Sequence, residues 1–167
     1  IKQLKYVNSL NDYNKSITIS TGPAGCGKTL FACQEAAKSY TDGNHSKIIL
    51  TRPTIAVDED LGYLPGSMHD KLAPWIRPMI DILSTYFTES QIENMIYNDK
   101  LEIAPLSYMR GRTFENSFVI GDEMQNSTKN QMKMLLTRIG TNSKMVIIGD
   151  PLQSDLKEDV NGLCDLI

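Results

Sequence analysis

The feature that most constrains the fold of this chain is the glycine-rich stretch 22–29, Gly-Pro-Ala-Gly-Cys-Gly-Lys-Thr. Immediately before it, Ile17 and Ile19 alternate with polar residues, which is typical of a β-strand. After it, apolar residues recur at helical spacing, at Leu30, Cys33, Ala37 and Tyr40. A strand, a glycine loop and a helix in that order form the setting in which Gly-x-x-x-x-Gly-Lys-Thr binds phosphate groups. The sequence therefore predicts a phosphate-binding loop.

The residue types of this loop suit a bound nucleoside triphosphate. Glycines let successive backbone N–H groups turn toward phosphate oxygens, and the N-terminus of the following helix adds partial positive charge. Lys28 brings a full positive charge to the phosphates, and the Thr29 hydroxyl is a ligand for Mg²⁺. An ordinary glycine-rich turn is the alternative, but it gives no reason for a lysine and a threonine to follow. The predicted nucleotide contacts from this stretch are Gly22, Pro23, Ala24, Gly25, Cys26, Gly27, Lys28, Thr29 and Leu30.

Length and composition indicate an ordinary globular protein. The chain has 167 residues, of which 41% are hydrophobic and 22% charged, which is enough for one domain with a buried core. No apolar run is long enough to span a membrane, and the 3 cysteines do not form a disulfide framework, so we expect a cytoplasmic protein. The net charge of −3 argues against non-specific coating of nucleic acid, although local basic loops are compatible with binding it. His45 lies in a polar turn without a partner at metal-ligand spacing, and it is expected on the surface.

Segments with strand and helix patterns alternate along the chain. Besides the strand before the glycine loop, apolar stretches predict strands at 47–51, 101–105, 117–123 and 144–149. The alternation predicts an α/β fold of the three-layer P-loop type, with a central, mainly parallel sheet of about five strands. We expect one domain over residues 1–167. In such sheets the ligand site lies at the carboxyl ends of the strands.

Several helix positions are also predicted. The first ten residues should form a short helix that turns Leu4, Val7 and Leu10 toward the core. A second helix is expected to begin near Pro74, because proline is tolerated in a first turn. Ser127 or Asn126 is expected to cap the helix that follows the fourth strand.

Polar residues follow two of the predicted strands. Asp122 comes directly after an apolar strand, where a carboxylate can hold the Mg²⁺ that bridges the phosphates. Glu123 is placed to orient or deprotonate an attacking water. The amide of Gln153, after the strand that ends before Asp150, suits contact with a γ-phosphate. The alternative for the two acids is that they are solvated charges at the end of a strand.

Phosphoryl transfer usually needs one more positive charge at the γ-phosphate, an arginine finger. Arg52, Arg110 and Arg112 are among the candidates, and the last two lie in a loop at the expected end of the sheet. This loop suits contact with a nucleic-acid backbone or with the nucleotide of a neighbouring subunit. The alternative is that its charges only solvate the loop.

Seven stretches of the chain resemble the PhoH-like family, and together they span nearly its whole length: 22–29, 62–66, 74–78, 103–113, 122–126, 131–138 and 149–153. PhoH-like proteins, common in bacteria and their phages, are predicted ATPases related to the first RecA-like domain of superfamily 1 helicases. Some relatives fused to a PIN nuclease domain couple ATP hydrolysis to RNA unwinding and cleavage, and family members are thought to form hexameric rings. The resemblance implies a RecA-like fold with ATP and Mg²⁺ as cofactors.

The resemblance also implies roles for particular residues. Gln3 would bind the adenine, and 22–29 would be the Walker A motif. The Walker B pair would be Asp122 and Glu123, and helicase motif III would contain Gly149, Asp150 and Gln153. Arg52 would belong to motif Ia. Two residues depart from the family pattern: Cys26 stands where threonine is commoner, and Gly121 where an aliphatic residue is usual. We expect the C-terminal arginine-bearing segment and the second RecA-like domain to be missing from this chain.

Our first hypothesis is an ATPase that acts on RNA or single-stranded nucleic acid as a homo-oligomer, with Lys28, Glu123 and Gln153 as catalytic residues. A hexameric ring is implied by the resemblance, and a neighbouring subunit would then supply the arginine. A small-molecule or nucleoside kinase is the second hypothesis, and it would need an acceptor pocket and lid in 54–73. The third is an assembly module that changes shape with the γ-phosphate and hydrolyses ATP only incidentally.

Overall fold

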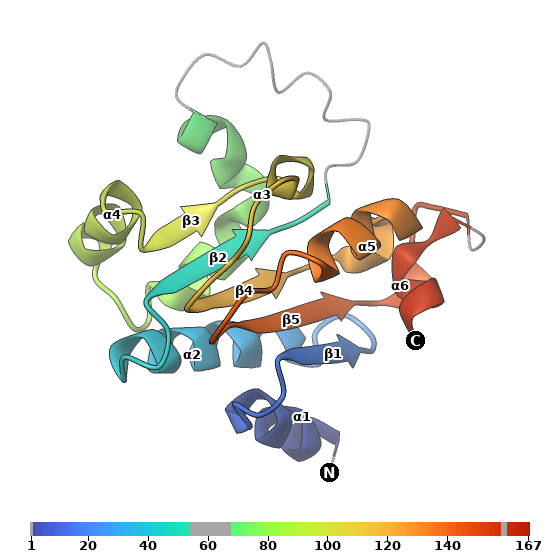
Figure 1. Ribbon diagram of the computed structural model, residues 1–167, viewed down its shortest axis with the longest axis horizontal. Helices are drawn as coiled ribbons and strands as arrows, with labels where there is room; N and C mark the ends of the chain where they lie inside the picture. Colours follow the sequence, from blue (N-terminus) through green and yellow to red (C-terminus); the bar gives the residue numbers. More distant parts are fainter. Residues whose placement is uncertain (1, 54–67, 158–159) are drawn as a thin grey trace.

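The computed structural model of the chain describes residues 2–53, 68–157 and 160–167 (Figure 1). At its centre lies a sheet of 5 strands in the order β1-β5-β4-β2-β3, and every pair in it is parallel. The strands are β1 (Ile17–Thr21), β2 (Lys47–Thr51), β3 (Leu101–Ile103), β4 (Ser117–Gly121) and β5 (Lys144–Gly149). The predicted fold class, an α/β fold with a parallel sheet, is confirmed.

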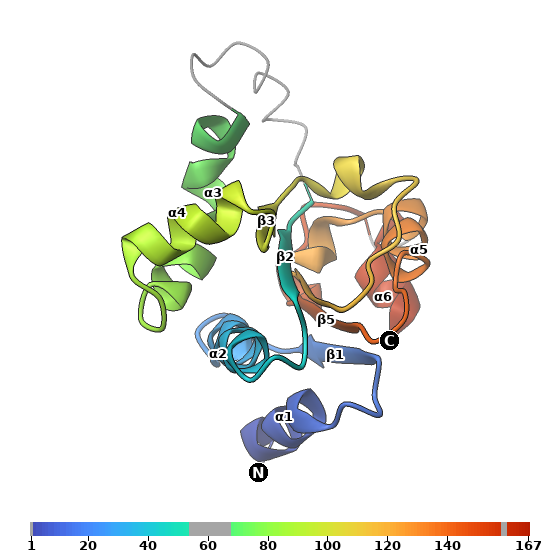
Figure 2. The ribbon, with the colours of Figure 1, turned by 60° about the vertical axis from the view of Figure 1, so that its left-hand side comes forward.

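Helices cover both faces of this sheet. They are α1 (Lys2–Asn11), α2 (Lys28–Thr41), α3 (Met68–Leu83), α4 (Glu89–Tyr97), α5 (Lys129–Leu136) and α6 (Gly162–Leu166). Short 3₁₀ turns are η2 (Leu106–Met109), η3 (Met124–Asn126) and η4 (Pro151–Gln153). The turned view shows α2, α3 and α4 on one side of the sheet and α5 and α6 on the other (Figure 2). Within the described ranges, none of these helices has the length and apolar character needed to cross a membrane.

Alternating residues of the central strands pack into two separate hydrophobic cores, one on each face of the sheet. In β4, Phe118 and Ile120 pack with α2 and α3, whereas Val119 packs with α5 on the opposite face. All five residues of β4 are buried, and so are all six of β5. This burial on both faces explains why these strands appear in the sequence as continuous apolar runs.

Two local predictions about helices were wrong. Leu4 is 64% exposed while Leu10 is 1% exposed, because α1 lies at the edge of the sheet and contacts it along one narrow stripe. The residue that caps α5 is Thr128, whose side chain accepts a hydrogen bond from the backbone N–H of Gln131. Ser127 is engaged elsewhere, since its hydroxyl donates to the carbonyl oxygen of Met124 and closes η3.

Helix α3 begins at Met68, so the prediction that Pro74 marks its start was also wrong. A proline inside a helix costs about 3 kcal/mol, since it removes a hydrogen bond and crowds the preceding turn. Ile76, Met79 and Leu83 are all buried, and each contributes about 2 kcal/mol. Helix α3 contains two prolines, Pro74 and Pro78, and the contribution of these buried side chains is of the same size as the combined cost of the prolines.

The structure also corrects the expectation for His45, which is 4% exposed rather than on the surface. Its Nδ1 lies 2.6 Å from the hydroxyl oxygen of Ser39, and its ring meets Phe118 edge-on at 5.6 Å. Burial and the positive charge of Lys144 lower the pKa of His45 below its usual 6.5. The folded protein therefore disfavours the protonated ring.

We expect this buried histidine to make the protein less stable in mild acid. The unfolded chain takes up a proton near pH 6.5 whereas the folded chain does not, so the free energy of unfolding falls as the pH drops below that value. Urea unfolding at pH 7.5 and pH 5.5 measures the loss, and His45→Gln should show a smaller one. An equal loss in both proteins would contradict the assignment.

Lys144 fixes the position of α1 at the edge of the sheet. The residue is 1% exposed, and its ammonium donates to the carbonyl oxygens of Ser9, Asp12 and Lys15 at 2.9 Å each. These carbonyls belong to the end of α1 and the loop that follows it. The start of β5 thus holds the helix that lies beside the glycine loop.

Candidate active site

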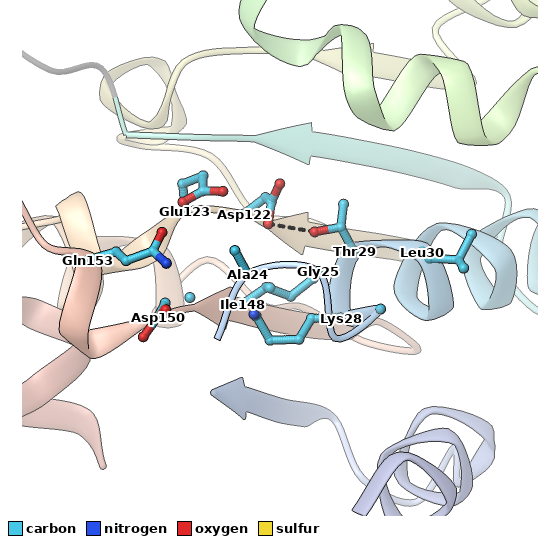
Figure 3. Close-up of a pocket in the computed structure, with 12 residues that line it drawn as sticks. Ala24, Gly25, Lys28, Thr29, Leu30, Asp122, Glu123, Ile148, Asp150 and Gln153 are labelled. Carbon is cyan, nitrogen blue, oxygen red and sulfur yellow. Dashed lines mark hydrogen bonds between the residues drawn. The ribbon is translucent and has the colours of Figure 1, made fainter. Parts of the chain in front are cut away.

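The order of the strands brings three separate sequence stretches to one place. Strand β5 lies between β1 and β4, so the carboxyl ends of these three strands are neighbours. A cavity of about 360 Å³ lies there (Figure 3). Its lining residues are Ala24, Gly25, Gly27, Lys28, Thr29, Leu30, Asp122, Glu123, Ile148, Gly149, Asp150 and Gln153.

The glycine loop has the geometry that its sequence requires. Gly27 precedes α2 with a φ of +88°, a left-handed conformation in which a side chain is strained, and a Cβ there would lie 3.0 Å from the ring of Phe31. The ammonium of Lys28 lies inside the loop, where it donates to the carbonyl oxygens of Gly22 at 2.6 Å and Pro23 at 2.8 Å. The lysine is therefore already held at the centre of the loop that is predicted to surround the phosphates.

Thr29 and Asp122 lie side by side in the cavity. The threonine hydroxyl donates to Oδ1 of the aspartate at 3.0 Å (Figure 3), and the aspartate side chain is only 2% exposed. A hydroxyl beside a carboxylate suits Mg²⁺, which binds few protein oxygens and takes its other ligands from water and phosphates. In the described part of the chain, no group of three or more His, Cys, Asp or Glu residues could hold a metal ion by itself. A metal at Thr29 and Asp122 would therefore depend on the phosphates of a nucleotide.

Arg52 also binds the aspartate, a contact that the sequence analysis missed. In the paired strands Thr51 lies opposite Gly121, so the next residues, Arg52 and Asp122, are neighbours. Both Nη2 at 2.6 Å and Nε at 3.2 Å donate to Oδ2 of Asp122. The arginine side chain is 17% exposed, so it lies within the site rather than reaching out from it.

Glu123 is held by a residue that the sequence analysis also missed as a site residue. Its backbone is left-handed, with a φ of +53°, which is uncommon for a residue other than glycine and is often found at functional sites. The side-chain amide of Gln125 donates to Oε2 of Glu123 at 2.6 Å and accepts from the backbone N–H of Asp150 at 3.2 Å. Gln125 is 2% exposed. One buried amide thus connects the glutamate that follows β4 to the residue that follows β5.

Close packing at the end of β5 explains why Gly149 is a glycine. A Cβ at this position would lie 2.5 Å from Cδ2 of Leu163 and 2.8 Å from Oε1 of Gln125. The next residue, Asp150, accepts a hydrogen bond from the backbone N–H of Leu152 at 3.1 Å, which starts the turn η4. This turn carries Gln153 to the wall of the cavity (Figure 3).

Helix α1 lies against the glycine loop, although none of its residues lines the cavity. The side-chain amide of Gln3 donates to the carbonyl oxygen of Cys26 at 3.1 Å, and the phenol of Tyr6 donates to the carbonyl oxygen of Lys28 at 3.0 Å. The ring of Tyr6 also meets Phe31 edge-on at 6.4 Å. Burial raises the pKa of Tyr6, so its phenol stays protonated and remains a donor. The sequence analysis assigned Gln3 to the adenine, which stays a prediction, and it did not name Tyr6.

A protein-family model described as PhoH-like protein matches residues 1–167. The chain belongs to the PhoH-like family. It is 44% identical over 168 residues to Protein PhoH of Escherichia coli strain K12, an alignment that covers 99% of this chain and 47% of that protein. It is also 44% identical over 158 residues to a PhoH-like protein of Bacillus subtilis, covering 95% of this chain and 49% of that one. For a PhoH-like protein of Synechocystis the identity is 42% over 155 residues, covering 93% and 47%. The chain thus spans about half the length of the curated relatives that it matches.

The departure of this PhoH-like chain at Gly121 has a structural reason. A Cβ there would lie 3.2 Å from Sδ of Met124 and 3.3 Å from Cδ2 of Leu135, so these side chains fill the space that an aliphatic residue would take. Of the other stretches that resemble the family, 62–66 lies outside the described residues.

The two loop arginines of this PhoH-like chain do not line the cavity. Arg112 forms a two-point ion pair with Glu102 and lies over the ring of Phe114 at 5.3 Å. Arg110 is exposed. Arg112 is therefore engaged within its own chain, and Arg110 is the one of the pair that is open to an external partner.

Proposed function

We propose that this PhoH-like chain binds ATP with Mg²⁺ and hydrolyses it. The observation that carries the proposal is that one cavity is lined by the glycine loop, by Asp122 and Glu123, and by Gln153. Phosphate binding, metal coordination and activation of water are the separate tasks of an ATPase, and this cavity holds residues suited to each.

In this proposal each group has one task. The backbone N–H groups of the loop and the ammonium of Lys28 bind the phosphates, and Thr29 and Asp122 hold the Mg²⁺, which neutralises charge on the phosphate oxygens. Glu123 orients the attacking water and accepts its proton. Gln153, at the same wall of the cavity, donates its amide to the γ-phosphate.

The arrangement favours a hydrolase over a kinase. A kinase transfers the phosphoryl group to a second substrate, and the residue next to its metal-binding acid need not be a carboxylate. Here Gln125 fixes Glu123 at 2.6 Å, which is what activation of a water molecule requires. The lid expected for a kinase was placed at 54–73, of which 54–67 lies outside the described residues.

We further propose that the protein acts on RNA or single-stranded nucleic acid as a homo-oligomer, in the hexameric form implied by the family resemblance. Two observations support a shared site. Among the described residues, Arg52 is bound to Asp122, and neither Arg110 nor Arg112 lines the cavity. An arginine from a neighbouring subunit would supply the charge at the γ-phosphate, and the exposed Arg110 suits that role or contact with a phosphate backbone.

The proposed function is tested by measuring Mg²⁺-dependent ATP hydrolysis over a range of protein concentrations, with and without single-stranded RNA. We expect the rate per subunit to rise with concentration and again with RNA, because subunits would complete one another's sites. A rate per subunit that changes neither with protein concentration nor with RNA would instead support the nucleotide-gated assembly module. A phosphorylated product in a panel of small-molecule acceptors would support the kinase.

We expect Gln125→Ala to lower kcat about tenfold while the KM for ATP changes by less than about twofold, because the amide positions Glu123 without touching the nucleotide. Steady-state hydrolysis measures both constants. Gln131→Ala is the matched control, since it removes an amide that bonds to the backbone of Thr128 in the capping box of α5. An equal fall in kcat in the two variants would mean that Gln125 acts only through stability.

A further inference from the structure

Both oxygens of the Asp122 carboxylate are engaged in this structure. Oδ1 accepts from the hydroxyl of Thr29 at 3.0 Å, and Oδ2 accepts from Nη2 and Nε of Arg52 at 2.6 Å and 3.2 Å. The carboxylate is 2% exposed and the guanidinium 17%. A buried carboxylate is costly without a counter-charge, and Arg52 supplies one.

The same carboxylate is the one that the proposed function gives to Mg²⁺. A divalent cation arriving alone would face the positive charge of Arg52 next to its ligand and would have to displace a two-point contact. Within the described residues it would also find no group of three or more His, Cys, Asp or Glu side chains that could hold it without a nucleotide. The phosphates of a nucleotide would remove both obstacles to metal binding, because they supply further oxygen ligands for the metal and an alternative acceptor for the guanidinium of Arg52.

We propose that Arg52 is a positioning residue that occupies the metal-binding carboxylate of the nucleotide-free protein, so that a divalent cation binds only together with a nucleotide. The inference rests on the proposed function for the identity of the site. Lys28 shows the same arrangement, because its ammonium is bonded to the carbonyl oxygens of Gly22 and Pro23 inside the loop. Both cations of the site are thus paired with groups of the protein, and each exchanges its partner when the nucleotide and the metal enter.

The test uses Mn²⁺ as the metal probe and measures free Mn²⁺ by electron paramagnetic resonance, with and without ADP. Without nucleotide, the wild-type protein should bind Mn²⁺ weakly, and Arg52→Gln should bind it at least about tenfold more tightly, because one unit of positive charge next to the ligand is removed. ADP should therefore tighten Mn²⁺ binding much less in Arg52→Gln than in the wild type. Arg52→Lys keeps the charge but loses the two-point contact, so its affinity for Mn²⁺ should lie between the other two.

Arg77→Gln is the matched control, because it also removes an arginine from an arginine–aspartate pair. Arg77 and Asp81 lie at 2.8 Å on the surface of α3, with side chains 71% and 61% exposed, so this variant should bind Mn²⁺ as the wild type does. Equal Mn²⁺ affinity in wild type and Arg52→Gln without nucleotide would overturn the inference. So would tight Mn²⁺ binding by Arg52→Lys equal to that of Arg52→Gln.

The design separates this inference from the proposed function. If the wild-type protein failed to bind ADP or ATP, the proposed function would fail. The comparison of Mn²⁺ affinities without nucleotide would still decide the role of Arg52. If nucleotide binding and hydrolysis were normal but Arg52→Gln did not change the affinity for Mn²⁺, the inference alone would fail.

Discussion

Glu123→Gln is expected to lower the rate of ATP hydrolysis by a factor of about 10²–10⁴ while leaving the affinity for ATP within about threefold of the wild type. The substitution keeps the size of the side chain and an oxygen that can accept from the amide of Gln125, whose bond to the glutamate measures 2.6 Å. It removes only the negative charge and the ability to accept a proton from water. The effect should therefore fall on kcat.

Single-turnover hydrolysis and equilibrium titration with a fluorescent ATP analogue measure the two quantities separately. Glu93→Gln makes the same chemical change at an exposed position on α4 and should leave both unchanged. Hydrolysis that survives in Glu123→Gln at close to the wild-type rate would show that another group activates the water. Loss of ATP binding together with hydrolysis would show that Glu123 supports the fold of the site.

The parallel sheet and the glycine loop were predictable because local physics determines them. Strands covered on both faces are apolar through their middle, and 118–120 in β4 and 145–148 in β5 show this pattern directly. A left-handed backbone at the start of α2 needs a glycine, and Gly27 satisfies that need. Such signals lie within short stretches, so they can be detected without knowledge of the tertiary fold.

The contacts that organise the site were not predictable in this way. Arg52 meets Asp122 because β2 pairs with β4, and Gln125 meets the backbone of Asp150 because β5 lies beside β4. These contacts depend on the order of strands in the sheet, which the sequence patterns do not contain. Once the order is known, the pair of Arg52 and Asp122 follows from the register of β2 and β4, whereas the position of Gln125 also depends on the turn η3.

The errors at His45 and at the cap of α5, which was assigned to Ser127 or Asn126, have a different origin, since these residues were judged by residue type alone. A histidine in a polar turn is usually exposed, but this one is drawn inward by Ser39 and the ring of Phe118. A serine near the start of a helix is a common cap, but Thr128 lies directly before α5 and is followed three positions later by Gln131, which completes the capping box.

Lys28→Met is expected to weaken the binding of ATP about 100-fold, which corresponds to the loss of about 3 kcal/mol of charge-assisted hydrogen bonding. The ammonium lies inside the loop, 2.6 Å from the carbonyl oxygen of Gly22 and 2.8 Å from that of Pro23, so phosphates that enter the loop must meet it. Methionine keeps most of the length of the side chain and loses the charge. Equilibrium titration with the same fluorescent analogue measures the change.

Lys38→Met is the matched control because Lys38 lies on the same helix, where it is exposed and donates to the side chain of Asn11 at 3.3 Å. It should bind ATP as the wild type does, and an equal loss in both variants would point to the stability of α2 rather than to phosphate binding. Lys28→Met should lose binding and therefore hydrolysis at low ATP, whereas Glu123→Gln should lose hydrolysis alone. That difference is expected only if phosphate binding and water activation belong to separate groups of one cavity, which is the central claim of the proposed function.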